Sequence, residues 1–324
     1  MNHIDVICML AQHEAKRAGG VLAESASFPQ IQIRRDGNRY AVNGVNHAGH
    51  DNEDRMDVVC RYIRERVLPN VDSATNVSGT YKIELHDTMQ PTDKNEGSLG
   101  SFCFSRSRHE RGDYPLIPDE FQMRDYSGLL SDYSDPLSWD RKQPKALFCG
   151  TTTGDRNPAK NERLQACDWA ARHGRGYSDF RITKVAQMRR EDVVAAYPDT
   201  HDKFSAPHVP IEKHYEYRYL VNIAGNTCSW NRVPLIMNSR SLMLHTYHPD
   251  MTWYYLAMRE GEHYVSTKVG EGLAGTMQFY ESNPQEAQLI TRNANRFVKQ
   301  FMGAPSAILY MTMLLENVAW YHGR

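Results

Sequence analysis

The second half of the chain predicts an α/β fold, built on a parallel sheet with helices on both faces. Short apolar runs typical of buried strands alternate there with segments of helical spacing. Such alternation is expected where helices cross over between parallel strands. The expected strands are 145–149, 180–185, 218–223, 241–245 and 263–267, and the expected helices are 159–172, 190–196, 230–239, 252–258, 284–302 and 305–321.

The first half is less regular. A hairpin is predicted where an alternating run from Phe28 to Arg35 meets a turn at Asp36-Gly-Asn38 and returns through residues 39–43. The other expected elements are helices at 4–17 and 56–67 and strands at 81–85 and 101–105. We therefore place a domain boundary near residue 140, within the segment 132–144.

Composition narrows the class of protein. The 324 residues carry 38 basic and 39 acidic side chains and are 40% hydrophobic, which fits a soluble globular protein and gives no reason to expect nucleic-acid binding. The apolar N-terminal run, residues 4–10, is short and is followed by charged residues, so we expect neither a secretory signal nor a membrane span. Six cysteines without close pairs indicate reduced thiols, and we expect a cytoplasmic protein.

Small, polar and cationic residues follow two of the predicted strands. Gly150, Thr151 and Thr152 come at the end of the first, and the loop Gly225-Asn-Thr-Cys-Ser229 follows another. Strand ends of this kind bind phosphate-bearing ligands in α/β folds, so the chain is expected to handle a nucleotide or another phosphorylated donor.

Two arginines could complete such a phosphate site. Arg232 follows the second loop, where a guanidinium suits a pyrophosphate, but an ordinary surface arginine beside a helix cap at Ser229 is as compatible with the pattern. Arg163 could reach a phosphate or pair with Glu162 or Asp168 on a solvated face.

A basic segment, residues 106–118, contains the carboxylate best placed for general-base work. Asp113 lies among cationic residues that would keep it ionised, ready to take a proton from a hydroxyl. From the residues alone, a turn aspartate after Gly112 is the favoured interpretation. Glu110, Asp119 and Asp87 compete for the role.

Several reaction classes lose support because their motifs are absent. The sequence has no Gly-x-x-x-x-Gly-Lys loop, no Gly-x-Gly-x-x-Gly and no Gly-x-Ser-x-Gly, which disfavours an NTPase, a dinucleotide oxidoreductase and a serine hydrolase. It also lacks the Asp-x-Asp element of manganese-dependent sugar transferases. Its histidines show no metal-ligand spacing, so no metal site is expected.

The order of motifs between about residues 87 and 302 resembles glycosyltransferase family 90, the group of protein O-glucosyltransferases and fungal capsule xylosyltransferases. In the first half the matching segments are Ser101-Phe-Cys-Phe-Ser105, Asp113 and Ile117-Pro-Asp-Glu-Phe121. In the second half they are Trp139, Lys145-Ala-Leu-Phe-Cys-Gly150, Asn161-Glu-Arg163, Tyr217-Arg-Tyr-Leu220, Gly225-Asn-Thr-Cys-Ser229, Ser239-Arg-Ser-Leu242, Glu262-His-Tyr-Val265 and Ala294-Asn-Arg-Phe297.

The resemblance implies a GT-B architecture, in which two Rossmann-like domains face a cleft. Residues 1–140 would form the acceptor-side domain, 141–304 the nucleotide-sugar domain, and 305–324 a helix that packs back on the first domain. The implied reaction is an inverting sugar transfer from a UDP-sugar to a hydroxyl of an oligosaccharide or other glycan acceptor. No metal cofactor would be required, although a divalent ion could accompany free UDP.

The resemblance also implies roles for single residues. Asp113 would be the catalytic base, and Asp87, Arg106 and Asp119 would lie on the acceptor side. The residues expected at the donor are Gly150, Thr151, Thr152, Arg163, Gly225, Asn226, Ser229, Arg232 and Tyr264. Arginines and helix-start amides, rather than a metal, would stabilise the leaving diphosphate.

Some features depart from the family pattern. Cys149 and Thr152 stand where arginines are usual, and Arg232 follows Ser229 by three positions rather than two. Cys149 and the shifted Arg232 motivate an alternative function, a nucleotide-sugar- or glycan-binding protein that has lost catalysis. For an active enzyme we expect UDP-xylose narrowly before UDP-glucose as donor, and action in a bacterial cytosol or in the cytosol of a virus-infected host.

Overall fold

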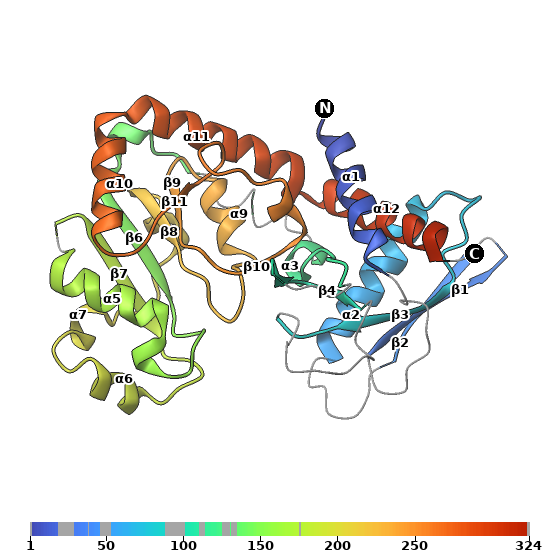
Figure 1. Cartoon of the computed structure of the whole chain (residues 1–324), viewed down its shortest axis with the longest axis horizontal. Helices are drawn as coiled ribbons and strands as arrows, with labels where there is room; N and C mark the ends of the chain where they lie inside the picture. Colours follow the sequence, from blue (N-terminus) through green and yellow to red (C-terminus); the bar gives the residue numbers. More distant parts are fainter. Residues whose placement is uncertain are drawn as a thin grey trace. The chain divides into compact units, whose positions relative to one another are not determined.

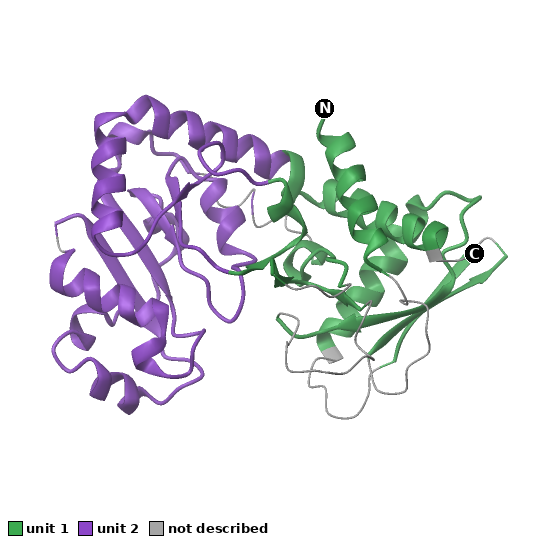
Figure 2. Cartoon of the chain, in the orientation of Figure 1, with its two compact units in different colours: residues 1–127, 249–257, 300–324 green, residues 128–248, 258–299 purple. Residues whose placement is uncertain are grey.

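The chain is described here from a computed structural model (Figure 1). The described residues are 2–18, 29–37, 39–45, 53–87, 101–109, 114–124, 130, 135–174 and 176–322. They divide between two compact units, coloured separately in Figure 2. Unit 1 comprises residues 1–127, 249–257 and 300–324, and unit 2 comprises residues 128–248 and 258–299. The division therefore falls at 127/128 rather than near 140, and unit 1 includes a short segment, 249–257, that sequence analysis assigned to the second domain.

Unit 2 is built on the parallel sheet that the sequence predicts. Its strands are β6 (Gln143–Thr151), β7 (Ser178–Lys184), β8 (Tyr217–Asn222), β9 (Leu242–His245) and β11 (Val265–Ser266), in the order β11-β9-β8-β6-β7. All four neighbouring pairs are parallel. The chain adds β7 on one side of β6 and then crosses to place β8 on the other side, so the direction of winding reverses between β6 and β8.

Helices cover both faces of this sheet, as expected. They are α5 (Glu162–His173), α6 (Arg190–Ala196), α7 (His201–Phe204), α8 (Ile211–His214), α9 (Arg232–Met237), α10 (Glu271–Ser282) and α11 (Pro284–Phe297). Because side chains alternate along a strand, Ala146 and Phe148 lie in the core with Leu164 of α5 and Leu273 of α10. Leu147 points to the opposite face and lines a pocket with residues of α8 and α9.

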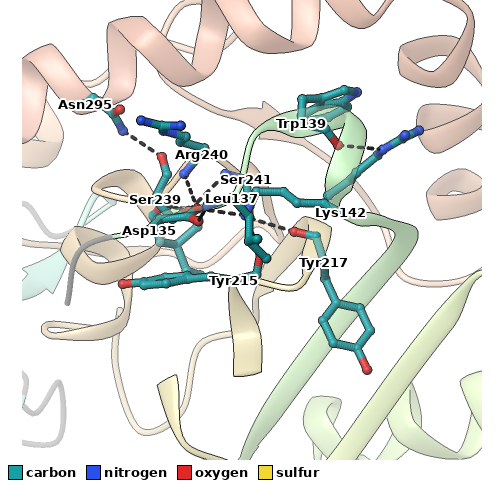
Figure 3. A network of polar contacts seen from close by, with 12 residues as sticks. Asp135, Leu137, Trp139, Lys142, Tyr215, Tyr217, Ser239, Arg240, Ser241 and Asn295 are labelled. Atoms are coloured by element: carbon teal, nitrogen blue, oxygen red, sulfur yellow. Dashed lines mark hydrogen bonds and ion pairs between the residues drawn. The ribbon is translucent and has the colours of Figure 1, made fainter. Parts of the chain in front are cut away.

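A buried ion pair lies at the amino-terminal ends of the strands of this sheet (Figure 3). The Lys142 ammonium lies 2.7 Å from Asp135, and both side chains are at most 1% exposed. Lys142 also donates to the Ser241 hydroxyl at 3.1 Å and to the Tyr215 carbonyl, while Asp135 accepts the backbone N–H of Arg240 at 2.6 Å. These contacts join the segments that precede β6, β8 and β9. The motif residues around Ser239-Arg-Ser241 therefore hold strands together, far from the strands' carboxyl ends.

Unit 1 contains a mixed sheet rather than a purely parallel one. The described strands are β1 (Gln30–Asp36), β2 (Arg39–Val45), β3 (Gly79–Glu84) and β4 (Phe102–Cys103), in the order β2-β1-β3-β4. β1 pairs antiparallel with β2, which confirms the hairpin, and with β3, whereas β3 and β4 are parallel. The described part of this unit thus differs from the Rossmann-like domain that the resemblance implied.

The helices of unit 1 include one from each end of the chain. They are α1 (His3–Lys16), α2 (Glu53–Tyr62), the π-helical turn Ile63–Val67, the 3-10 turn Leu68–Asn70, α3 (Glu120–Met123) and α12 (Ala304–His322). The C-terminal α12 packs along α1, as Figure 1 shows. Among the described residues, no helix combines the length and apolarity that crossing a bilayer requires.

The segment 249–257 belongs to unit 1 through aromatic packing. The strand β10 (Asp250–Met251) pairs with β5 (Arg106–Ser107), and the expected helix at 252–258 is only a 3-10 turn, Trp253–Leu256. The Trp253 ring stacks on Tyr310 at 4.3 Å between centroids, and its indole N–H donates to Gln122 at 2.9 Å. The aromatic residues here are core residues.

The buried pair predicts a strong dependence of stability on Lys142. Replacing Lys142 by Met should lower the free energy of unfolding by about 3–5 kcal/mol, because it leaves Asp135 charged and unpaired in the core. The matched control is Lys213→Met, which removes an exposed ion pair with Glu216 and should leave the urea midpoint unchanged. Equal shifts in the two variants would contradict the structural role given to the pair.

Candidate functional site

The carboxyl ends of β6 and β8 lie side by side where the winding of the sheet reverses. Ligands of open α/β sheets bind in the crevice at such a reversal, because the two following connections leave in opposite directions. Here the crevice is bordered by residues 152–154 after β6 and residues 223–226 after β8. The two loops singled out from the sequence are therefore brought together.

Arg163, on the first turn of α5, ties these two loops to each other. Its guanidinium donates to the carbonyl of Ala224 at 2.8 Å and to that of Ile223 at 3.0 Å, on the β8 side. On the β6 side it donates to the Thr151 carbonyl at 3.1 Å and to the Thr153 hydroxyl at 2.6 Å. Arg163 is 7% exposed, so it is not an arginine of a solvated face, and most of its donors are held by the protein itself.

Two asparagines complete the junction. The Asn226 side-chain oxygen accepts the backbone N–H of Gly154 at 3.1 Å, which joins the loop after β8 to the loop after β6. Asn161 caps α5 by accepting the N–H of Leu164 and donates to the carbonyls of Thr152 and Asp155. The loops are thus fixed by side chains at the start of α5 and within the loops.

Gly225 allows the close approach of these groups. A Cβ atom added there would lie 2.6 Å from the Thr153 hydroxyl and 3.0 Å from an Arg163 nitrogen. At Gly150 the added atom would lie 2.8 Å from the Phe148 ring and 3.0 Å from Arg232. Both glycines therefore serve by leaving room for arginine side chains.

Arg232 is the first residue of α9 and lies near the carboxyl end of β6, beside Phe148. It donates to the carbonyl of Cys149 at 2.8 Å, and its guanidinium carbon lies 4.8 Å from the centre of the Phe148 ring. Its Nη1 atom is buried and has no hydrogen-bond partner. Since buried donors in folded proteins are nearly always satisfied, this nitrogen is one that a ligand could use.

The two guanidiniums lie in a site without a compensating carboxylate. Within the described part of the chain neither Arg163 nor Arg232 takes part in an ion pair. Burial, and then the charge of Arg232, lower the pKa of Arg163 to about 9, and burial lowers the pKa of Arg232 to about 10. The lowered pKa values mean that burial disfavours the charged forms of both arginines, and a bound anion would offset this effect.

The remaining donor-side candidates divide into two groups. Ser229 keeps a buried hydroxyl without a partner, beside the loop that leads to Arg232. Thr152, in contrast, is fully buried, and its hydroxyl both donates to the Ala186 carbonyl and accepts the Ala186 N–H. The structure therefore assigns the Thr152 hydroxyl to holding the segment after β7, not to a ligand. The Thr151 hydroxyl lies 3.3 Å from that of Thr153.

Tyr264 lies next to the ends of β8 and β9. Its ring meets His245 edge-on, with 5.2 Å between centroids, and the His245 Nδ1 atom lies 2.9 Å from the Asn222 side-chain nitrogen. Asn222 is fully buried, and its side-chain oxygen has no partner. Sequence analysis found no metal-ligand spacing for His245 or the other histidines and did not single out Asn222, because each lies at the end of an apolar strand without a recognisable motif.

An open pocket of about 380 Å³ adjoins the carboxyl ends of these strands, on the face of the sheet that α5 covers. Glu162 and Trp169 of α5, Tyr247 after β9 and Lys268 after β11 contribute to its lining. Ile223 lines it too, and the Ile223 carbonyl is one of the acceptors of Arg163. The pocket therefore adjoins the end of β8, where Arg163 binds, and it offers an aromatic surface, a carboxylate and a cation.

The acceptor-side candidates in unit 1 are largely occupied. Arg106 is 2% exposed and forms a 2.7 Å ion pair with the fully buried Glu14, so it cannot contact an acceptor. Asp119 is also fully buried and caps α3 through the N–H groups of Phe121 and Gln122. Both are corrections to the sequence prediction.

Asp87 and Asp113 remain. Asp87 is partly exposed and forms a 2.8 Å ion pair with Arg55, which also binds Glu120 at 2.9 Å. Asp113, the predicted base, lies outside the described residues. Across the described ranges no group of three or more His, Cys, Asp or Glu side chains could hold a metal ion.

Comparison with known families identifies the chain. The model of glycosyl transferase family 90 matches residues 119–321, which is more than half of the chain. The chain belongs to glycosyltransferase family 90. The matched region contains Arg163, Arg232 and both of the loops that they contact.

Curated proteins with similar sequences carry O-glucosyltransferase names. The O-glucosyltransferase rumi homolog of Anopheles gambiae is 27% identical over 183 residues, which is 55% of this chain and 42% of that protein. Protein O-glucosyltransferase 1 of Homo sapiens is 24% identical over 186 residues, 55% of this chain and 42% of that protein. The chain thus aligns with less than half of the length of these relatives.

Among solved structures, sucrose-phosphate synthase from Thermosynechococcus elongatus aligns with a TM-score of 0.37 and 13% identity, covering 64% of this chain and 50% of that one. A likeness at this level carries no argument about the fold of this chain.

The junction predicts that Gly225→Ala is harmful. The added methyl group would push Thr153 and Arg163 apart, so we expect both a lower melting temperature and weaker nucleotide binding. The control is Gly275→Ala in α10, where nothing lies within 4 Å of the added atom and alanine favours the helix by about 0.5–1 kcal/mol. Thermal unfolding and calorimetric titration with UDP would check both effects. If the Gly225→Ala variant had the melting temperature and the UDP affinity of the parent chain, the packing described here would be wrong.

Proposed function

We propose that the chain is a glycosyltransferase that binds a UDP-sugar at the carboxyl ends of β6 and β8 and transfers the sugar to a hydroxyl of a glycan acceptor. The observation that carries the proposal is the pair of buried guanidiniums, Arg163 and Arg232, with no carboxylate among their described partners. A diphosphate supplies the missing negative charge. Membership of family 90 supports the reaction class.

In this proposal the two arginines have different tasks. Arg163 donates most of its hydrogen bonds to loop carbonyls, so its main contribution is to position the loops and to add positive potential. Arg232 has an unpartnered Nη1 and is the better direct ligand of a phosphate oxygen. The Ser229 hydroxyl is a further donor. Gly150, Thr151, Gly225 and Asn226 shape the backbone around the ligand.

The uridine moiety is proposed to bind in the pocket beside α5. Aromatic rings such as Trp169 and Tyr247 suit a nucleobase face, and Glu162 could accept hydrogen bonds from ribose hydroxyls. Tyr264, which contacts His245 at the neighbouring strand ends, would then lie near the sugar or diphosphate.

The mechanism that follows is a single displacement with inversion at the anomeric carbon. A base removes the proton of the acceptor hydroxyl, and the oxygen attacks as the bond to the diphosphate breaks. Positive groups fixed before the reaction stabilise the charge that develops on the leaving diphosphate, without a protein-bound metal. Asp113 remains the predicted base. The GT-B arrangement and action in the cytosol also stay predictions.

For the donor sugar, the names of the relatives favour glucose. The curated relatives that match are called O-glucosyltransferases. The sequence-based preference for xylose finds no support among them, so UDP-glucose is the first donor to test.

A panel of sugar nucleotides tests the function. UDP release should be fastest from UDP-glucose, slower from UDP-xylose and absent from GDP-mannose, in the presence of mixed glycan acceptors. UDP binding without release from any donor would favour the alternative of a non-catalytic nucleotide-sugar-binding protein. Absence of UDP binding at millimolar concentration would overturn the proposal.

A second test addresses the diphosphate. Arg232→Gln should weaken UDP binding roughly 10- to 100-fold, the usual cost of losing a charged hydrogen bond, and should leave uridine binding nearly unchanged. Arg240→Gln is the matched control, since Arg240 is exposed at the opposite, amino-terminal ends of the strands. Calorimetric titration measures both ligands. If the two variants lost equal affinity, or if uridine binding fell as much as UDP binding, Arg232 would not be the phosphate ligand.

A further inference from the structure

Unit 1 carries an open pocket that the proposed reaction does not use. It has a volume of about 430 Å³ and lies between the end of α2, the π-helical turn that follows, and the end of α3. Its lining residues are Val58, Arg61, Tyr62, Glu65, Arg66, Met123 and Arg124. All of them belong to unit 1, whereas the diphosphate site belongs to unit 2.

The helical part of the lining forms one face. Val58, Arg61, Tyr62 and Glu65 recur at the spacing that places side chains on the same side of a helix. A π-helical turn begins at Ile63, and Arg66 within it also reaches the lining. Turns of this kind are uncommon and are found frequently at functional sites.

The lining has an excess of positive charge. Among the lining residues that the structure describes, Arg61, Arg66 and Arg124 contribute three guanidiniums, and Glu65 contributes one carboxylate. Among the described residues, neither Arg61 nor Arg124 forms an ion pair. Guanidinium groups bind phosphate and carboxylate with paired, parallel hydrogen bonds, which makes a neutral ligand the poorer match.

Tyr62 supplies an independent observation that points to a ligand in this pocket. The residue is 4% exposed, and its hydroxyl oxygen is buried without a hydrogen-bond partner. Leaving a buried hydroxyl unsatisfied costs stability, so such a group needs an explanation. Burial raises the pKa of this phenol, which therefore stays protonated and can donate a hydrogen bond.

The charged groups around the hydroxyl are Arg66 and Asp119. Asp119 caps α3 with one oxygen, while its other oxygen is buried and unpartnered. Burial raises the pKa of Asp119 to about 7, so near neutral pH a large part of it is uncharged and opposes an incoming anion only weakly. The competing explanation is a water molecule that bridges Tyr62 and Asp119.

We propose that this pocket binds the phosphate or carboxylate group of a sugar-sized ligand. Arg61, Arg66 and Arg124 provide the charge, and the Tyr62 hydroxyl provides a directed donor. The volume lies in the range of pockets that hold small organic molecules, so a free inorganic ion would fill only part of it. The site is independent of the proposed transferase reaction.

The test is calorimetric titration of the full chain in the presence of saturating UDP, which keeps the diphosphate site filled. The probes are glucose 6-phosphate, glucuronate, inorganic phosphate and neutral glucose. We expect binding of the two anionic sugars, weaker binding of phosphate and none of glucose. Equal binding of glucose and the anionic sugars, or no binding of any anion at millimolar concentration, would overturn the proposal.

Matched variants locate the site. Arg124→Gln should weaken glucose 6-phosphate binding about tenfold or more. Arg64→Gln is the control, because Arg64 is exposed on the π-helical turn that also carries Arg66 but does not line the pocket. Equal losses in the two variants would show that only the general charge of the surface matters, and would refute a specific pocket.

Tyr62→Phe separates ligand binding from a structural role. Removing an unsatisfied hydroxyl should leave the melting temperature of the free protein unchanged or higher, and should weaken glucose 6-phosphate binding about tenfold. If a water bridge to Asp119 were the reason for the hydroxyl, the variant would be less stable, Asp119→Asn would mimic it, and the affinity for the anion would not change.

Discussion

The guanidinium of Arg163 is the contact on which the site of this chain depends. It lies at the point where the sheet of unit 2 reverses its winding, and it binds carbonyl oxygens from both of the strand ends that flank the reversal. Backbone carbonyls at the ends of strands lack partners in the sheet and need them once they are buried. A single planar group with five donors satisfies several of them at once and fixes two loops in one arrangement.

That arrangement explains the rest of the local sequence. Gly225 is needed because Arg163 passes close to it, and Gly150 because Arg232 does. Phe148 lies within 6 Å of both guanidiniums and offers them an aromatic face in place of a carboxylate. The result is a buried concentration of positive charge that the described residues leave uncompensated. Such a site is suited to a ligand that carries two adjacent negative groups.

The sequence predicted unit 2 better than unit 1 for a physical reason. Strands covered on both faces leave continuous apolar runs, and these can be read locally. The helix α10 escaped prediction because it contains Gly272 and Gly275, which disfavour helices, and only tertiary burial of residues such as Leu273 and Met277 stabilises it. The pairing of β5 with β10 joins segments more than 140 residues apart, and no local pattern reports it.

The same distinction applies to the site. Strand-end patterns predicted roles for Arg163, Ser229 and Arg232, and the sheet brings the two arginines together beside Phe148. They were not enough for Arg106, whose buried partner Glu14 is 92 residues away. The sequence also could not show which groups bind Arg163. They are mainly backbone carbonyls, rather than the acidic side chains that lie beside it on the helix.

The most direct test of the central claim is a crystal structure of the chain with UDP. The account predicts a phosphate oxygen within hydrogen-bond distance of the Arg232 Nη1 atom, with the hydrogen bonds of Arg163 to the loop carbonyls unchanged. UDP bound elsewhere on the chain, or bound at this crevice with Arg232 still facing no phosphate, would contradict it.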